Sequence, residues 1–416
     1  MVTGATPGED VDAAPQGAPS TVGGPQGGDP SDVDGAGHGS AEGAPDAGHP
    51  GGRSTPALRP ADLLRPAGIF LASRVVVLTA MWFATRLPPG RSMSSVLSTW
   101  DGGWYLLAAA SGYPGAVPEA AGSTLAFFPA YPVLVGAFEA LPFLEPIGAG
   151  LVVGGLAALA ATVVIWVLGR QLLGADVADR AVALFVFFPG SFVLSMVYAE
   201  GVMLLLSAGC LLALVRRRWL VAGVLAALAT ASRPNAVAVV AACGWAALAA
   251  ARSGRGWRGF VAPALAPLGI LGFFAHLWAR TGEPTAWFSA QRAGWQERVA
   301  PLAVVDDLRR FVGAPFADVN NSVAAIGAVL AVGGVVLLVR SGLPGEVIAF
   351  ALGVLALAFV SETLGARPRF ILTAFPVFYA AAVRLRGVAF STVVGMAACT
   401  LGGFTVLSVS TLLATP

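Results

Sequence analysis

The segment TWDGGWY at residues 99–105 places one carboxylate, Asp101, between two tryptophans just after a long apolar run. A positioned carboxylate can act as a general base, taking the proton of a hydroxyl while that hydroxyl attacks an electrophilic carbon. It can also do no more than cap a helix, here one expected at 102–111, because Asp is favoured at helix N-termini. Taken alone, the segment favours the cap. Together with the motifs described below, it predicts that Asp101 is a general base.

Three arginines lie where an anion could be bound. Arg367 and Arg369 flank Pro368 in ARPRF, so two cations share one rigid turn and are the better candidates for a phosphate. The guanidinium group presents a planar fork of donors that suits phosphate oxygens. Arg233 and Asn235, in SRPN, could also bind phosphate. The alternative for Arg233 is that it extends its head group out of the membrane from the end of a short helix.

The composition excludes several classes of chemistry. The chain has no lysine, which excludes a Walker A phosphate loop and a Schiff-base lysine. Of its 3 histidines only His276 lies outside the N-terminal tail, which argues against a Ser-His-Asp triad or a histidine-centred metal site. Nothing in the sequence supports nucleic-acid binding, a cofactor or a metal. Asp306 and Asp307 resemble a metal-binding pair but precede two arginines, so we interpret them as a solvated helix face with ion pairs.

The chain is 56% hydrophobic and only 12% charged, which is typical of a protein that spans a membrane many times. Apolar runs that could cross the ~30 Å of hydrocarbon recur throughout. No strand-like alternation is present, so we predict an all-α polytopic membrane protein with about 10–11 transmembrane helices. The expected spans are 66–87, 147–169, 181–199, 200–215, 219–232, 235–251, 259–280, 323–340, 346–361, 370–384 and 387–412.

The arginines in the short connections predict the orientation. Most of them fall on one side if eleven spans alternate, and that side is expected to be cytoplasmic. The acidic, Gly- and Pro-rich residues 1–58 lie on the same side and are predicted to be a disordered tail, followed by a membrane domain at 59–416. Two large segments, 88–146 and 281–322, then face outward. We therefore expect a multi-pass protein of the cell membrane with Asp101 on the extracytoplasmic side.

Five motifs in order carry a family resemblance: TWDGGWY, AFFPAYP, FFPGSFVLSMVYAEGVMLLLS, ATASRPN and ARPRFILTAFPVF. Together they resemble the PIG-V family, the GPI mannosyltransferase II group of the GT-C type of multi-spanning glycosyltransferases. The similarity covers roughly residues 66–385. Three departures leave the acceptor open: Thr99 stands where the family has Arg, YAEG at 198–201 replaces Tyr-Thr-Glu-Ser, and SRPN at 232–235 replaces the last motif.

The resemblance implies an inverting glycosyltransferase that moves a hexose, with mannose favoured, from a polyprenyl-phosphate donor. The acceptor would be a hydroxyl of a lipid, a glycan or a protein on the outer face. Two other classes stay open, a lipid-linked sugar flippase or other transporter and a non-catalytic membrane assembly protein. A transporter should place charges near the membrane midplane, and it does not need one Asp in an outer segment.

Within this interpretation, further residues are candidates for substrate binding. Trp100, Trp104 and Tyr105 could stack on a sugar ring or anchor the segment at the headgroup level, the commoner role of such residues. Glu200 could orient a substrate hydroxyl or pair with Arg233, and the pairing is favoured because an unpaired buried carboxylate is costly. Two more candidates, which could line the acceptor path from the second outer segment, are Gln291 and Trp295.

Overall fold

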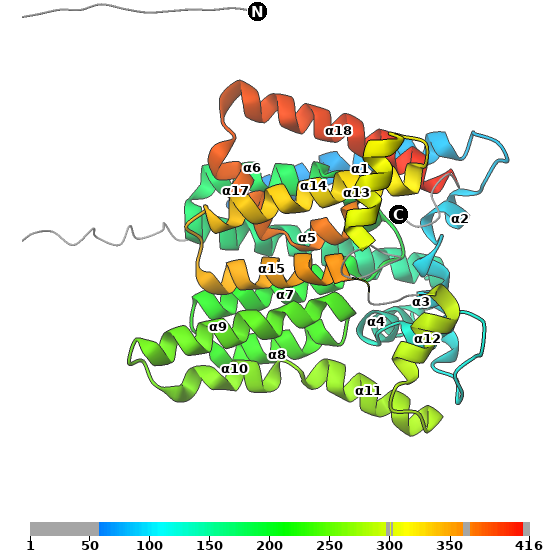
Figure 1. The fold of residues 1–416 in the computed structure, drawn as a ribbon, viewed down its shortest axis with the longest axis horizontal. Helices are drawn as coiled ribbons and strands as arrows, with labels where there is room; N and C mark the ends of the chain where they lie inside the picture. Colours follow the sequence, from blue (N-terminus) through cyan, green and yellow to red (C-terminus); the bar gives the residue numbers. More distant parts are fainter. Residues whose placement is uncertain (1–57, 297–299, 301–302, 361–366, 411–416) are drawn as a thin grey trace, which may run out of the picture. The chain divides into compact units, whose positions relative to one another are not determined.

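The computed structural model describes residues 58–296, 300, 303–360 and 367–410. All regular elements among these residues are α-helices or short 3-10 helices. The tail predicted at 1–58 lies outside the described residues except for its last position. The fold is built from long apolar helices that lie side by side, with shorter helices gathered at one end (Figure 1).

Over the described residues, each predicted span overlaps one helix or a run of consecutive helices. Six helical stretches are long and apolar enough to cross a membrane: Pro60–Ala84, Pro146–Leu173, Pro234–Arg252, Trp257–Thr281, Val319–Val339 and Gly387–Val409. These correspond to α1 (Leu64–Ala84), α5 (Pro146–Leu173), α9 (Ala238–Arg252), α10 (Val261–Leu265) with α11 (Leu268–Thr281), α14 (Val319–Val339) and α18 (Gly387–Val409). The predicted all-α, multi-spanning class is therefore confirmed.

The remaining predicted spans are shorter or broken. α6 (Ala175–Phe187) and η3 (Pro189–Ser195) pass the same test only as a pair, bent by 79°. The pair α16 (Pro368–Thr373) and α17 (Pro376–Arg384) is also interrupted at a proline. Three apolar helices have fewer residues than a typical span: α7 (Glu200–Val215), α8 (Trp219–Thr230) and α15 (Gly345–Val360).

A proline that interrupts a helix leaves backbone carbonyl groups without their helical hydrogen-bond donors. Inside a membrane these carbonyls must accept from another donor. Arg74 of α1, only 7% exposed, supplies that donor at the break between α6 and η3. Its guanidinium donates to the carbonyl oxygens of Val186 (3.1 Å) and Ser191 (2.7 Å). The sequence analysis did not single out Arg74, and the structure gives this intramembrane cation a role in holding the bend.

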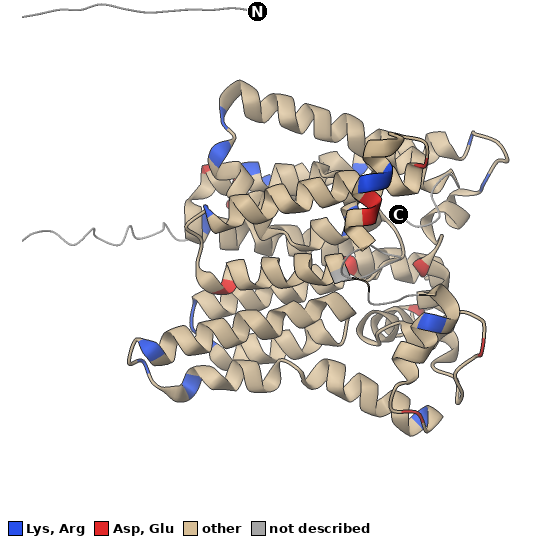
Figure 2. Cartoon of the chain, in the orientation of Figure 1, with Lys and Arg blue, Asp and Glu red and all other residues tan. Residues whose placement is uncertain are grey.

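The two segments predicted to face outward fold into short helices at the same end of the molecule (Figure 1). The first contains α2 (Met93–Leu97), α3 (Asp101–Ser111), η2 (Thr124–Ala126) and α4 (Ala130–Glu139), and the second contains α12 (Ala286–Trp295) and α13 (Ala303–Gly313). They meet where the indole of Trp287 donates to the carbonyl of Ala126 at 3.2 Å. Most of the acidic residues that the structure describes lie at this end (Figure 2).

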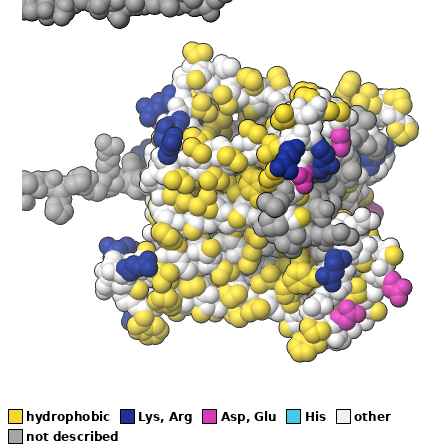
Figure 3. All heavy atoms as spheres, in the orientation of Figure 1, with side chains coloured by type: hydrophobic (Ala, Val, Ile, Leu, Met, Phe, Trp, Pro, Cys, Tyr) yellow, Lys and Arg dark blue, Asp and Glu magenta, His cyan; other side chains and the backbone are white. Residues whose placement is uncertain are grey.

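The described surface fits a lipid environment. On the face seen in Figure 3, a broad apolar band separates the charged side chains that gather toward the two ends. Large hydrophobic side chains are exposed on the long helices, including Val75 at 66%, Val329 at 61% and Met396 at 64%. Exposed apolar area of this extent is unusual for a soluble monomer, and it is expected where helices contact lipid.

Candidate active site

The backbone around Asp101 forms a strained turn. Trp100 has φ 52° and ψ −116°, values typical of the second residue of a type II′ turn, a position that favours glycine. The N–H of Gly102 closes the turn by donating to the carbonyl of Thr99 at 3.2 Å. Arg91 supports it by donating to the Thr99 hydroxyl at 3.0 Å. Such a backbone costs ~1–3 kcal/mol and persists only where its surroundings hold it in place.

This turn places Asp101 at the first residue of α3, with Trp100 as the N-cap and no side chain capping the helix. The Asp101 carboxylate instead reaches across to α16, where its Oδ2 atom accepts from Arg369 Nη1 at 2.8 Å. Its backbone N–H faces the Tyr198 hydroxyl at 3.4 Å. The geometry therefore gives Asp101 an ion-pair partner from a distant segment and assigns it no capping bond.

Arg369 is positioned by the contact between two proline breaks. α16 starts with Pro368, whose fixed φ suits the first position of a helix. The backbone of Pro368 lies against Gly190 of η3 so closely that a Cβ on Gly190 would be 2.3 Å from the Pro368 carbonyl oxygen. The Arg369 guanidinium, with a side chain 4% exposed, also stacks over the Phe370 ring at 4.8 Å.

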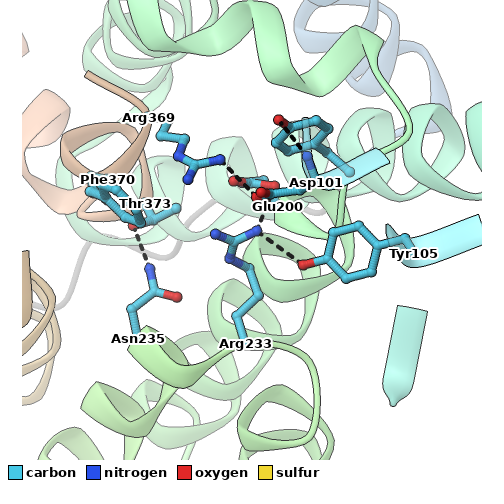
Figure 4. A network of polar contacts seen from close by, with 9 residues as sticks. Asp101, Tyr105, Glu200, Arg233, Asn235, Arg369, Phe370 and Thr373 are labelled. Atoms are coloured by element: carbon cyan, nitrogen blue, oxygen red, sulfur yellow. Dashed lines mark hydrogen bonds and ion pairs between the residues drawn. The ribbon is translucent and has the colours of Figure 1, made fainter. Parts of the chain in front are cut away.

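A second acid–arginine pair lies beside the first (Figure 4). Arg233 Nη1 is 3.0 Å from Glu200 Oε2, and the two side chains are 7% and 1% exposed. The same nitrogen donates to the Tyr105 hydroxyl at 3.3 Å. Burial raises the pKa of Tyr105, so its phenol stays protonated at neutral pH. Glu200 thus pairs with Arg233, which is the alternative that the sequence favoured.

These groups surround a cavity of about 90 Å³ between α3, η4 (Pro234–Val237), α12 and α16. Residues from four distant parts of the sequence share it. Seven of the predicted substrate-site residues are among those that line it: Asp101, Tyr105, Arg233, Asn235, Gln291, Trp295 and Arg369. Its other lining residues, which the sequence analysis did not name as site residues, are Ala126, Phe127, Phe128, Ser232, Pro234 and Phe370.

Four other predicted site residues do not line this cavity. Trp100 packs against the main hydrophobic core, and Glu200 lies behind Arg233. Trp104 stacks on Phe127, with ring centroids 6.0 Å apart, and meets Trp295 edge-on at 5.6 Å. It therefore supports two wall residues from behind.

Arg367 is the fourth of these residues, and the structure separates it from Arg369. It is 7% exposed and is the N-cap residue of α16, outside the cavity lining. Burial, together with the positive charge of Arg369, lowers the pKa of the Arg367 guanidinium to about 10. The two arginines of the ARPRF turn thus point to different surroundings, and Arg369 is the one that faces Asp101 (Figure 4).

The acidic pair on α13 behaves as an ion-paired helix face. Asp306 pairs with Arg309 at 3.4 Å, and Asp307 pairs with Arg310 at 2.6 Å. This confirms the prediction of local ion pairs. Within the part of the chain that the structure describes, no three His, Cys, Asp or Glu side chains form a group that could hold a metal ion.

The chain is similar to known proteins in structure and not in sequence. No family model matches the chain, and no curated protein matches it in sequence. Among solved structures, the chain is similar to ArnT from Cupriavidus metallidurans, crystallised with undecaprenyl phosphate, at 16% sequence identity and a TM-score of 0.49. The alignment covers 79% of this chain and 63% of ArnT. The PIG-V resemblance stays a prediction, and the function proposed below rests on the geometry of the site.

Sequence reasoning missed Tyr198 as a site residue. Its ring lies 5.8 Å from the Arg369 guanidinium, and its hydroxyl faces the Asp101 backbone at 3.4 Å. A signal was present, because Tyr198 comes two residues before Glu200 in the motif YAEG. Tyr198 is only 1% exposed and was hidden among apolar neighbours, so composition alone gave no reason to select it.

Proposed function

We propose that this protein is a membrane glycosyltransferase that moves a hexose from a polyprenyl-phosphate donor to an acceptor hydroxyl on the extracytoplasmic face. Asp101 is the general base, and the favoured hexose is mannose. One observation carries the proposal: a single carboxylate and two guanidinium groups, far apart in sequence, line one cavity at an end of the helices. Transfer of a sugar from polyprenyl phosphate needs both a carboxylate, which takes the acceptor proton, and cations, which bind the phosphate.

The chemistry follows from the charges. The acceptor oxygen forms a bond to the anomeric carbon from the side opposite the phosphate, and the bond from that carbon to the phosphate oxygen breaks. Its electron pair leaves with polyprenyl phosphate, a stable anion that requires no general acid. The acceptor proton passes to Asp101 as the new bond forms. Arg369 and Arg233 bind the phosphate, where Arg forms strong charge-assisted hydrogen bonds.

The Asp101–Arg369 pair makes donor binding precede proton transfer in this mechanism. Arg369 Nη1 lies 2.8 Å from Asp101 Oδ2. A phosphate bound to the same guanidinium competes for those N–H donors and releases the carboxylate toward the acceptor hydroxyl. The base is then freed only when a donor is in place, which limits proton transfer in an empty site.

The alternatives fit the placement of the charges less well. A flippase or other transporter is expected to carry its binding charges near the membrane midplane. Asp101 instead lies on α3, in the first segment predicted to face outward, and Arg369 lies in the first turn of α16, at the outer end of a predicted span. An assembly protein gives no reason to hold a strained turn, a carboxylate and two buried cations around one cavity.

The substitution Asp101→Asn tests the proposal, because it keeps the size of the side chain and removes the proton acceptor. We expect transfer of radiolabelled mannose from polyprenyl phosphate into the acceptor fraction of membranes to fall by ~10²–10⁴-fold. Asp306→Asn is the matched control, since Asp306 is a 65% exposed acid on α13. Near-normal transfer by inserted Asp101→Asn protein would refute the role of Asp101.

A further inference from the structure

The hydrogen bonds around Asn235 determine which end of its side-chain amide faces the cavity. Asn235, on η4, is 9% exposed, and its Nδ2 lies 3.0 Å from the Thr373 hydroxyl of α16. That hydroxyl also lies 2.7 Å from the carbonyl oxygen of Phe370. A carbonyl oxygen can only accept, so the single proton of Thr373 is committed to Phe370. Thr373 must therefore accept from Asn235, which fixes the NH₂ group toward Thr373.

The amide oxygen of Asn235 is then turned away from Thr373 (Figure 4). This oxygen is buried and has no hydrogen-bond partner among the described residues. Buried amide oxygens in folded proteins are nearly always paired, and an exception needs an explanation. Asn235 lines the cavity that also contains Asp101, Arg233 and Arg369, so a bound ligand is the partner that this oxygen is placed to meet.

The hydrogen-bonding properties of this oxygen limit which chemical group of a ligand it can bind. An amide oxygen only accepts hydrogen bonds, and the oxygens of an ionised phosphate only accept as well. The amide oxygen of Asn235 therefore does not fit a phosphate oxygen. It fits a hydroxyl group. Two residues away in the chain, Arg233 supplies donors for a phosphate, and the sugar of a polyprenyl-phosphate donor is bonded directly to that phosphate.

We propose that Asn235 is a specificity-determining residue that accepts a hydrogen bond from one hydroxyl of the transferring sugar, with Thr373 fixing the amide in the required orientation. This inference rests on the proposed function and adds to it a subsite that recognises one hydroxyl of the sugar. A site built to bind a hydroxyl discriminates strongly against an analogue that lacks it, because the buried polar group is then left unpaired.

Binding measurements on the purified full-length protein test this inference with three probes. These are polyprenyl phosphate, polyprenyl-phosphate mannose and the set of monodeoxy mannose derivatives of the latter. The variant Asn235→Leu keeps a similar volume without the acceptor. We expect it to bind polyprenyl phosphate as the wild type does and to bind the mannosyl lipid about tenfold more weakly. The monodeoxy derivative that lacks the contacted hydroxyl should bind the wild type about as weakly as the mannosyl lipid binds Asn235→Leu. For this derivative, the substitution Asn235→Leu should weaken binding no further.

Thr373→Val is the second variant, and it leaves Asn235 in place. It removes the oxygen that orients the amide, so preference for the mannosyl lipid should fall while binding of polyprenyl phosphate is unchanged. Equal loss for all probes in both variants, or the same loss with every monodeoxy derivative, would overturn the inference. Failure of the wild type to bind bare polyprenyl phosphate is a different result, because it would overturn the proposed function itself.

Discussion

Gly190 provides a sharp test of how the fold positions the site, because it touches no substrate and lies against the backbone that carries Arg369. A Cβ added at this position would lie 2.3 Å from the Pro368 carbonyl oxygen and 2.7 Å from the Arg369 nitrogen. Both atoms belong to the main chain, so no side chain can rotate away. The substitution Gly190→Ala must therefore separate η3 from α16.

The size of the effect follows from these distances. Ordinary van der Waals contact begins at 3.4 Å, so η3 and α16 must separate by about 1 Å. Overpacking of this kind costs ~1–3 kcal/mol of stability. The same shift would take Arg369 Nη1 away from Asp101 Oδ2, now 2.8 Å apart, and out of hydrogen-bonding range. A 1 Å misplacement in an active site can cost ~10²-fold in rate.

The assay compares Gly190→Ala with Gly155→Ala, which adds the same methyl group to α5 where no heavy atom lies within 4 Å. We expect detergent-purified Gly190→Ala protein to melt at a lower temperature than the control and to transfer mannose at least tenfold more slowly. Equal melting temperatures and equal rates would show that the packing of η3 on α16 does not position Arg369.

Two further predictions concern the buried ion pair and the orientation. Glu200→Gln alone leaves Arg233 charged and buried, so we expect it to lower the free energy of unfolding by ~3–5 kcal/mol, seen as less folded protein after mild heating. Glu200→Gln combined with Arg233→Gln should recover much of this stability, and a double variant as unstable as the single one would contradict the prediction. The orientation is tested in a Cys399→Ser background, which removes the exposed cysteine. A cysteine placed at Ser94 should react with an impermeant thiol reagent added outside intact cells, and a cysteine placed at Ser253 should not. The reverse pattern would invert the proposed topology.

The sequence predicted the helices better than their interruptions. Continuous apolar runs indicate helices in a membrane, because every backbone group must be satisfied within the segment. Two interruptions lie at prolines, since η3 begins at Pro189 and α17 begins at Pro376. That η3 and α16 contact each other could not be predicted, since the contact depends on the close approach that Gly190 permits.

The site was predicted as a set of residues more than as an arrangement. Charged residues in an apolar chain are rare enough to be selected by type alone, which is why Asp101, Arg233 and Arg369 were identified. Their partners could not be assigned, because a guanidinium can pair with any carboxylate that the fold brings near. Trp100 shows the limit of pattern reading. Its type suggested a sugar-stacking or headgroup role, and nothing in the pattern indicated that its backbone forms the turn before Asp101.

The two acid–arginine pairs differ in a way that selects the base. In the Glu200–Arg233 pair the carboxylate side chain is 1% exposed, so an acceptor hydroxyl has no access to it. In the Asp101–Arg369 pair the arginine is 4% exposed and the carboxylate 18%, so the acid is the accessible partner. A general base must come within hydrogen-bonding distance of the proton it removes. In the proposed function, Glu200 therefore holds Arg233 in place for the phosphate, and Asp101 is the carboxylate that an acceptor can reach.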